Sequence, residues 1–438
     1  MSACLVALAT LGWIMDLRTR LQRMNLRRDA PATPSELSPR PAQPPLESLV
    51  EGQWVVSSGS RCFVAERLYP LEHFCGGLRL LDLLTLRPQE WMPLGMSGDS
   101  PSFDPGHAAF IDIETTGLAR GAGTYAFLVG LGFFVSQGFL VRQYFMPDYA
   151  DEDMLLDLVA RDLAGKTGLI SFNGRSFDWP IIETRYVLAR REPPCRDTPH
   201  LDLLLFSRRL WRRVLPSCAL SSLERSVLGI DRDDIDVPSY LIPQMYQDYV
   251  RRGLTQPLVG VFYHNEMDLI SMVALATWVA RVVSSPFGQE HASLCDHLAL
   301  GRLYESGGRT GEALLAYQVA AQRGRGRWEI DAACKRLSFL LKRLGRYDEA
   351  MEVWRRKMDG AEVYPYVELA KQLEHRLHDY AGARRVTLQA TDWVQRNAGR
   401  LGASRRRRLM AELRHRLARV ERLMARTGTQ AETTTEVT

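Results

Sequence analysis

Four acidic residues in the middle of the chain carry the clearest chemical signal. Asp112 and Glu114 belong to the run Ala108-Ala-Phe-Ile-Asp-Ile113 and its continuation, whose nearly continuous apolar composition is typical of a buried strand. Residues i and i+2 of a strand project from the same face, so both carboxylates point the same way. Two like charges side by side in a buried strand repel each other unless a cation lies between them. The pair therefore indicates a cation site.

Two further acids lie far along the chain. Asp178 follows a strand-like run and opens a helical stretch, and Asp268 lies near the start of an apolar helix predicted from about Asn265 to Val283. Asp178 alone is explained equally well as a helix cap, and a lone acid such as Asp268 at a helix start usually stabilises the helix dipole. With the first pair, they complete an all-oxygen ligand set of the kind that two Mg²⁺ or Mn²⁺ ions need. Two such ions would activate water and neutralise charge during phosphodiester hydrolysis.

A histidine and a tyrosine compete for the role of orienting or deprotonating the water. His264 precedes Asp268 by four positions and Tyr263 precedes it by five. On a helix, four positions leave side chains about 40° apart, whereas five leave them about 140° apart. This geometry favours His264 if the helix already includes residue 264, and Tyr263 if the helix begins later. A helix-start His bonded to backbone is the structural alternative.

The elements that must position these residues follow a recognisable order. Three strands are predicted over 108–113, 125–135 and 139–145, followed by a helix from 151 to 163, a strand over 168–172 and a helix from 179. A short segment over 201–204, a helical stretch over 221–228 and the long apolar helix complete the series. This order predicts an α/β, RNase H-like fold: a mixed sheet flanked by helices.

The C-terminal part repeats itself. Gly308-Arg309 and Glu312-Ala313 recur 37 residues later, and helical patterns dominate the whole segment. The repeat length predicts an all-α, tetratricopeptide-like domain. Such repeats present a concave surface for a protein partner, although stacking for stability alone is the other interpretation.

Two motifs resemble those of known nucleases. Phe110-Ile-Asp-Ile-Glu-Thr-Thr-Gly-Leu118 resembles the first motif of DEDD 3′→5′ exonucleases, and Phe172-Asn-Gly-Arg-Ser-Phe-Asp178 resembles the second as it occurs in family B DNA polymerases. The segment from Glu114 to Gly130, together with Leu215-Pro-Ser-Cys-Ala-Leu220, more narrowly resembles the bacterial YprB-like family, which joins an RNase H-like domain to tetratricopeptide repeats.

The resemblance implies a metal-dependent 3′→5′ exonuclease that acts on single-stranded DNA or RNA with two divalent cations, Mg²⁺ or Mn²⁺. The implied metal ligands are Asp112, Glu114, Asp178 and Asp268, with His264 as the further catalytic residue. The implied contacts with the terminal nucleotide and the walls of its site are Thr115, Thr116, Leu118, Asn173 and Phe177. The third motif departs from the family pattern, which has Tyr four positions or His five positions before the last Asp. The alternative function is therefore a nucleic-acid-binding or scaffold protein with a weak or lost nuclease centre, acting through its repeats.

Composition bounds the remaining segments. The predicted divisions are an N-terminal helix over 1–27, a disordered Pro-rich linker over 28–47, a small β-containing extension over 48–100, the nuclease domain over 101–285, the repeats over 290–400, and an Arg-rich helix with a disordered tail over 401–438. The formal charge of +5 suits a polyanionic partner without requiring one.

Cysteine usage and hydropathy bear on the compartment. The seven cysteines lack the spacing of a zinc or redox motif, which favours a reduced, cytoplasmic protein. The apolar N-terminus is shorter than the roughly 20 residues of a spanning helix, and no other stretch is expected to cross a membrane. The arginine-rich segments 208–213 and 405–408 are interpreted first as solvated helix faces, with phosphate contact as the alternative.

Overall fold

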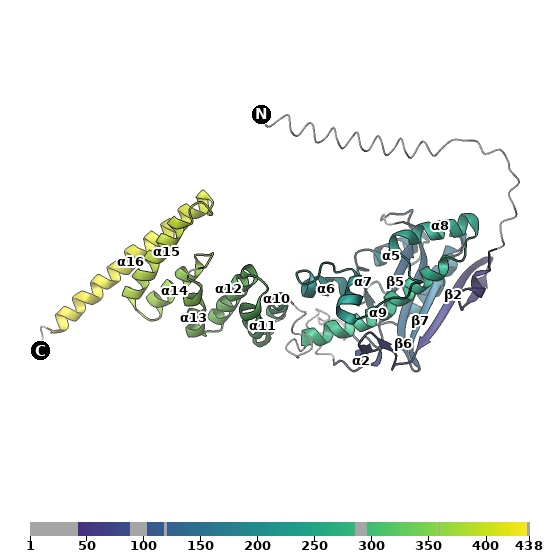
Figure 1. The fold of residues 1–438 in the computed structure, drawn as a ribbon, viewed down its shortest axis with the longest axis horizontal. Helices are drawn as coiled ribbons and strands as arrows, with labels where there is room; N and C mark the ends of the chain where they lie inside the picture. Colours follow the sequence, from purple (N-terminus) through teal and green to yellow (C-terminus); the bar gives the residue numbers. More distant parts are fainter. Residues whose placement is uncertain (1–42, 88–102, 118–120, 285–295, 359, 436–438) are drawn as a thin grey trace, which may run out of the picture. The chain divides into compact units, whose positions relative to one another are not determined.

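A seven-stranded mixed sheet forms the centre of the N-terminal part (Figure 1). The computed structural model describes residues 43–87, 103–117, 121–284, 296–358 and 360–435. The strand order is β1-β2-β7-β6-β5-β8-β9, in which β8 and β9 run parallel to β5 and the other pairs are antiparallel. The strands are β1 (Gln53–Ser57), β2 (Ser60–Tyr69), β5 (Ala109–Thr115), β6 (Ala126–Val135), β7 (Gly138–Phe145), β8 (Leu169–Ser171) and β9 (His200–Asp202).

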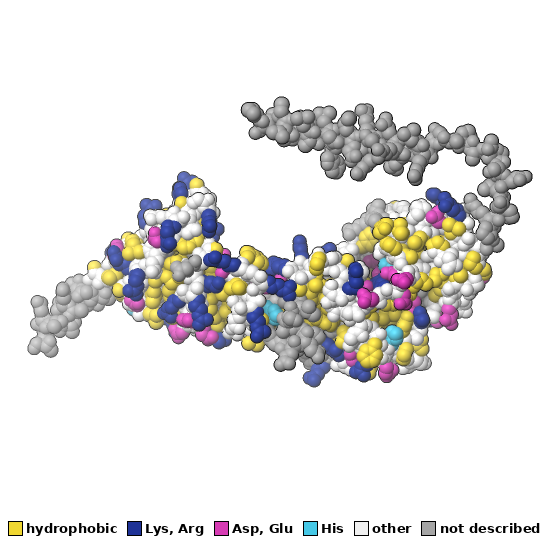
Figure 2. All heavy atoms as spheres, viewed as in Figure 1, with side chains coloured by type: hydrophobic (Ala, Val, Ile, Leu, Met, Phe, Trp, Pro, Cys, Tyr) yellow, Lys and Arg dark blue, Asp and Glu magenta, His cyan; other side chains and the backbone are white. Residues whose placement is uncertain are grey.

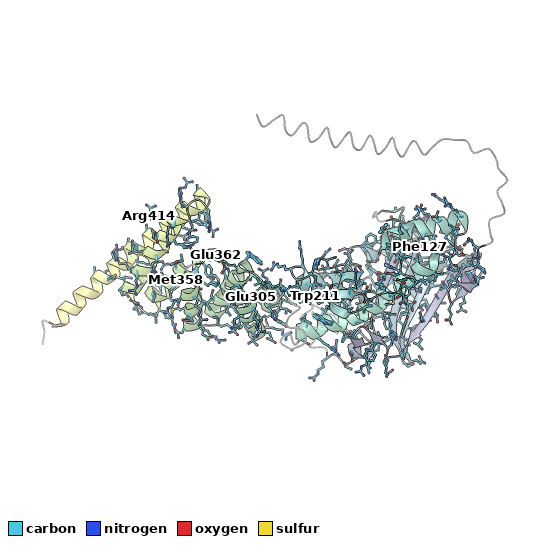
Figure 3. The ribbon with its side chains drawn as sticks, viewed as in Figure 1. Phe127, Trp211, Glu305, Met358, Glu362 and Arg414 are labelled. Carbon is cyan, nitrogen blue, oxygen red and sulfur yellow. The ribbon has the colours of Figure 1, made fainter. Side chains whose placement is uncertain are left out.

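Helices cover both faces of this sheet, which confirms the predicted fold class. They are α4 (Glu152–Leu163), α5 (Asp178–Leu188), α6 (Leu203–Trp211), α7 (Leu220–Leu223), α8 (Ile242–Arg252) and α9 (Leu258–Ser284). The two faces of β5 belong to different core clusters: Phe110 packs with residues of α9, whereas Ile111 packs with residues of α4 and α5. Phe127 and Trp211, labelled in Figure 3, are fully buried in these two clusters.

Helix α9 is the longest element of this part and crosses three strands of the sheet. It begins at Leu258, seven residues before the predicted start, and it contacts β5, β6 and β7. By length and apolar composition alone, α9 could span a membrane, although the sequence analysis expected no such stretch after the N-terminus. However, 78% of its most apolar window is buried inside the fold. Tyr69 and Arg67 of β2 both hold Glu266 of α9, so the helix is fixed to the sheet.

Residues 48–100 are predicted as a small β-containing extension, and the structure has strands there, but these strands join the sheet of the domain that follows. Strand β2 pairs with β7 along seven residues, and β1 pairs with β2, so both belong to the seven-stranded sheet. Alternation along the chain indicates strands but not their partners, which is why the sequence did not reveal this pairing. Leu46, in the predicted linker, is buried in a short 3₁₀ turn over Leu46–Ser48. The predicted helix over 1–27 lies outside the described residues.

The C-terminal part is all-helical. Its helices are α10 (His297–Ser306), α11 (Thr310–Arg323), α12 (Arg327–Arg343), α13 (Tyr347–Lys357), α14 (Tyr364–His375), α15 (Tyr380–Arg396) and α16 (Ala403–Thr435), and each packs against the next. Helices α13 and α14 begin 37 residues after α11 and α12, which matches the offset of the sequence repeat. The tetratricopeptide assignment itself stays a prediction. Helix α16 continues to Thr435, so most of the predicted disordered tail is helical.

One row of residues across the sheet fixes α9 over β5. Asp112 of β5, Gly130 of β6 and Gln143 of β7 are neighbours in register. The side chain of Asn265 lies above Gly130, where a Cβ atom would approach the Asn265 Oδ1 atom to 2.1 Å. Asn265 Nδ2 donates to Asp112 Oδ2 at 2.8 Å, and its Oδ1 accepts from Gln143 Nε2 at 2.9 Å. The glycine therefore lets the helix approach closely enough to bond both strands.

Substitution of Gly130 tests this close approach. We expect Gly130→Ala to destabilise the domain by about 1–3 kcal/mol, because the added methyl group forces Asn265 and α9 away from the sheet. Gly77→Ala, at a position with nothing within 4 Å of the new Cβ, is the matched control. Urea unfolding of the single variants, of Asn265→Ala and of Gly130→Ala/Asn265→Ala measures the coupling. Additive effects of the two substitutions would contradict this account.

Candidate active site

The structure places Asp112 and Glu114 on the face of β5 that α9 covers. Ile111 and Ile113, which alternate with them, are 1% and 5% exposed on the opposite face. Asp112 and Glu114 are each partly buried. Asp112 and Glu114 therefore lie on the same face of β5, as their i, i+2 spacing predicts.

The four predicted acids act on one another electrostatically, so they lie in one region of the fold. Burial, the charge of Asp268, and then the charges of Glu114 and Asp178 raise the pKa of Asp112 well above its usual value. Burial and the charges of Asp268 and Asp178 likewise raise the pKa of Glu114. Carboxyl groups with such pKa values resist ionisation unless a cation compensates them.

Asp178 begins α5 and faces the end of β5. Burial raises its pKa to about 7, although hydrogen bonds from its own backbone amide and that of Ile113 oppose the rise. β8 ends at Ser171, opposite the first half of β5, and therefore leaves the amide of Ile113 without a strand partner on that side. Gly174 makes the turn possible, since a Cβ there would lie 2.4 Å from Ser171 Oγ and 3.2 Å from Asp178 Oδ2.

Asp268 is held by a buried arginine that the sequence analysis did not single out. Arg232 has a side chain only 8% exposed, and it forms ion pairs with Asp268 and with Glu224, whose Oε1 lies 2.5 Å from its Nη2. Its Nη1 lies 3.6 Å from Asp236 Oδ1. The charge of Arg232 also lowers the pKa of Glu114, against the larger effects that raise it. Arg232 is thus the internal cation nearest the acidic cluster among the described ion pairs.

His264 and Tyr263 point to different partners. Because α9 begins before residue 264, His264 and Asp268 share one side of the helix, with His264 Nε2 4.0 Å from Asp268 Oδ2. His264 Nδ1 lies 2.7 Å from Asp236 Oδ1, and its Nε2 lies 3.0 Å from Ser239 Oγ. The hydroxyl of Tyr263 instead accepts from the backbone amide of Asp233 at 3.0 Å. The condition that favoured His264 holds, while its catalytic role stays a prediction.

Two of the residues predicted to contact the nucleotide, Thr115 and Thr116, use their hydroxyl groups to bond the backbone. The Thr115 hydroxyl donates to Gly117 O at 2.8 Å, and the Thr116 hydroxyl accepts from Tyr125 N at 3.1 Å, so both fix the turn after β5. Leu118 lies outside the described residues.

The loop before Asp178 contains the other two predicted contacts. Asn173 adopts a left-handed conformation (φ 68°), and its amide donates to Asp202 Oδ1 at 2.8 Å. Asp202 also accepts from the amide of Leu204 at 3.0 Å, so it joins this loop to the start of α6. Phe177 is half-buried against the core.

Several residues that hold the site were missed by the sequence analysis: Gly130, Gln143, Glu224, Arg232, Asp236 and Asn265. A glycine inside a buried strand is a known sign of close approach and could have indicated Gly130. The lone Arg232 in the acidic run Asp231-Arg-Asp-Asp-Ile-Asp236 was a second available signal. Nothing in the spacing indicates that Asn265 would reach Asp112, because that contact depends on where α9 crosses the sheet.

The donor set suits a hard divalent cation in type and charge. Within the described ranges, no three His, Cys, Asp or Glu side chains are gathered closely enough to hold an ion as they stand. Asp268 bonds Arg232 and Asp112 bonds Asn265, so part of the set is directed to other partners. Burial, and then the charges of the neighbouring acids, raise the pKa of Asp112 and of Glu114, so a cation would stabilise their charged forms. Oxygen ligands are those that Mg²⁺ and Mn²⁺ prefer. The residues present therefore fit such ions, given small side-chain movements.

Comparison with known proteins supports the fold and the relationship. A family model described as RNase_H superfamily matches residues 109–280. The chain is 30% identical over 341 residues to YprB of Bacillus subtilis (strain 168), a match that covers 75% of this chain and 80% of YprB.

A likeness to a solved structure is much weaker. The family B DNA polymerase of the hyperthermophilic archaeon Pyrobaculum calidifontis aligns with a TM-score of 0.34 and 11% identity, over 50% of this chain and 30% of that chain. The relationship rests instead on the extensive match to YprB and on the superfamily domain that contains all four acids. The chain belongs to the YprB family and carries an RNase H superfamily domain.

Proposed function

We propose that this protein is a metal-dependent nuclease that shortens single-stranded nucleic acid from its 3′ end. The observation that supports the proposal most is that Asp178 and Asp268, from two separate helices, lie close enough for their charges to raise the pKa of Asp112 and of Glu114 on β5. An RNase H superfamily domain suits phosphodiester hydrolysis, and the attack on a 3′ end follows from the resemblance of the first two motifs. A structural role for four clustered carboxylates would be costly, because each destabilises the others.

The proposed chemistry divides the work among the residues of the chain. Asp112, Glu114, Asp178 and Asp268 would hold two Mg²⁺ or Mn²⁺ ions, which supply water activation and charge neutralisation when bound. Asn265 orients the Asp112 carboxylate by its bond to Oδ2. Asp236 holds the His264 ring through Nδ1, while Nε2 lies 3.0 Å from Ser239 Oγ and 4.0 Å from Asp268 Oδ2. Nε2 would orient the water or accept its proton in place of its contact with Ser239.

A cleavage assay tests the activity. Single-stranded DNA and RNA labelled at the 5′ end are incubated with Mn²⁺ and the wild type or Asp112→Ala/Glu114→Ala. We expect a ladder of progressively shorter labelled products from the wild type alone. Asp153→Ala/Asp157→Ala is the matched control, since it removes two exposed carboxylates that pair only with Arg191 at the surface, and it should cleave as the wild type does.

Other product patterns would point elsewhere. Internal fragments without a ladder would indicate endonuclease action and would overturn the proposed direction. Binding without shortening by the wild type would favour the alternative, a nucleic-acid-binding or scaffold protein that acts through its helical repeats.

The buried carboxyl groups predict how stability depends on pH without divalent cations. Burial raises the pKa of Asp178 from 3.8 to about 7, so between these values the folded chain keeps a proton that the unfolded chain has released. Folding stability contributed by this group therefore falls as pH rises through the window, by on the order of 1 kcal/mol per pH unit. In EDTA, the melting temperature of Asp178→Asn should exceed that of the wild type by a margin that grows from pH 4 to pH 7.

Two control experiments accompany this prediction. Asp157→Asn, which neutralises a carboxyl group that is 64% exposed, should show no such growing margin. Saturating Mn²⁺ should remove or reverse the advantage of Asp178→Asn, because the cation would then compensate the wild-type carboxylates. A difference in melting temperature that stays constant from pH 4 to pH 7 would contradict the raised pKa of Asp178.

Paired substitutions distinguish the two candidates for the water-orienting residue. We expect His264→Ala to lower kcat by about 10²–10⁴-fold, the usual contribution of a general base. Tyr263→Phe should leave kcat close to that of the wild type, because the hydroxyl bonds the Asp233 amide rather than facing Asp268. The reverse order of effects would assign the role to Tyr263.

A further inference from the structure

Four exposed arginines gather at the C-terminal end of α6. Arg208 and Arg209 lie in its last turn, and Arg212 and Arg213 follow it directly. Trp211, between the two pairs, is fully buried, so the arginines lie on the outer side of the helix end. Cations near a helix C-terminus are favoured by its dipole, but that effect is limited to the last turn and does not explain a group of four.

These arginines line a cavity of about 370 Å³ together with residues of α10. Its described lining includes a fifth arginine, Arg302, and a single carboxylate, Asp296. Asp296 is already engaged, because its Oδ1 accepts from the Ala299 amide at 2.8 Å and caps α10. Its Oδ2 lies 3.5 Å from Arg213 Nη1, a distance at the limit of a hydrogen bond. The positive charge of the cavity is therefore largely uncompensated.

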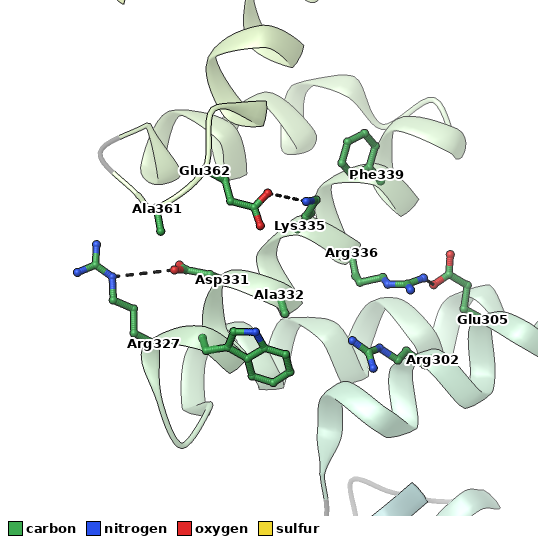
Figure 4. Close-up of a pocket in the computed structure, with 11 residues that line it drawn as sticks. Arg302, Glu305, Arg327, Asp331, Ala332, Lys335, Arg336, Phe339, Ala361 and Glu362 are labelled. Carbon is green, nitrogen blue, oxygen red and sulfur yellow. Dashed lines mark hydrogen bonds and ion pairs between the residues drawn. The ribbon is translucent and has the colours of Figure 1, made fainter. Parts of the chain in front are cut away.

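Arg302 gives independent evidence of a missing partner. Its Nε atom is buried and has no hydrogen-bond partner among the described residues. Arg302 also lines a second cavity, of about 770 Å³, shown in Figure 4. There, Lys335 pairs with Glu362 at 2.5 Å, and Arg336 lies 3.4 Å from Glu305. Lys335 and Arg336 of this second cavity have ion-pair partners, whereas none is described for Arg302. An anionic ligand would accept a hydrogen bond from its buried Nε atom.

We propose that Arg208, Arg209, Arg212, Arg213 and Arg302 form a binding site for the phosphodiester backbone of single-stranded nucleic acid. Guanidinium groups bind phosphate oxygens in a two-pronged geometry, and several arginines spread over two helices suit an extended chain of phosphates better than one compact anion. The identity of the ligand rests on the proposed function.

Two features favour a nucleic-acid strand over an acidic peptide. Trp328 of α12 is 59% exposed, and the guanidinium of Arg213 lies 4.7 Å from its ring centroid, so a stacking surface adjoins the arginines. Exposed aromatic rings between cations are typical of single-strand binding. In addition, α6 begins beside the candidate active site, where Asp202 caps the helix and bonds the Asn173 amide. Arg208 follows Asp202 by six residues, about 9 Å along the helix axis, so the arginines begin close to this point.

Salt-dependent binding in EDTA tests the inference without any need for cleavage. Fluorescence anisotropy of a labelled single-stranded oligonucleotide is measured with the full-length wild type and Arg208→Ala/Arg212→Ala over a series of salt concentrations. We expect the variant to bind on the order of tenfold more weakly, and the slope of log K against log salt to become shallower by about 1.4, because each lost phosphate contact accounts for about 0.7. Arg302→Met should lower the slope by about 0.7.

The matched control is Arg355→Ala/Arg356→Ala on α13, which removes the same charge from exposed residues that line neither cavity. An equal loss in this control, or no loss in the α6 variant, would overturn the site. Equally tight binding of polyglutamate, weakened to the same extent in the α6 variant, would show that the ligand is an acidic protein. A wild type that binds at the arginines but never cleaves would sink the proposed nuclease function and leave the binding site standing.

Discussion

The central constraint on this structure is the accumulation of like charge beside a buried strand. Asp112 and Glu114 lie on one face of β5, and Asp178 and Asp268 add their charges from two helices. Desolvation and mutual repulsion both oppose ionisation, so the metal-free site must be stabilised by protons or by internal cations. Residues of the surrounding elements reduce this repulsion through hydrogen bonds and ion pairs to the acids.

Two devices offset the repulsion, and they act on different acids. The amide of Asn265 donates to Asp112, which stabilises its charged form and fixes α9 over Gly130 at the same time. Arg232 supplies positive charge to Asp268 from a loop before α8 and is itself held by Glu224. Glu224 is almost completely buried together with Arg232. Removal of either residue would therefore leave the charge of the other buried without a partner. Asp112 and Asp268 are therefore each held in a defined position by a partner from another element.

Sequence patterns predicted the parts of this arrangement that depend on local rules. The alternation around Asp112 gave both the strand and the face of the two acids, because side-chain direction in a strand has a strict period of two. The start of α9 and the membership of β2 in the sheet could not be obtained in this way. Helix boundaries without a capping signal and the choice of strand partner both depend on tertiary packing. The acidic run around Arg232 was a local signal, but its ion pairs with Glu224 and Asp268 depend on the same tertiary packing.

The boundary of α9 shows how a small error of local structure changes a chemical conclusion. Had the helix begun at Asn265, His264 would have been free to turn away and Tyr263 would have been an equal candidate. Because the helix starts at Leu258, the ring of His264 is fixed on the side of Asp268, and Asp236 holds its Nδ1. The exchanged order of the two residues relative to the family pattern is therefore compatible with one imidazole facing the acids. The position of each residue around the helix, and not the order of His and Tyr in the sequence, decides which of the two lies beside Asp268.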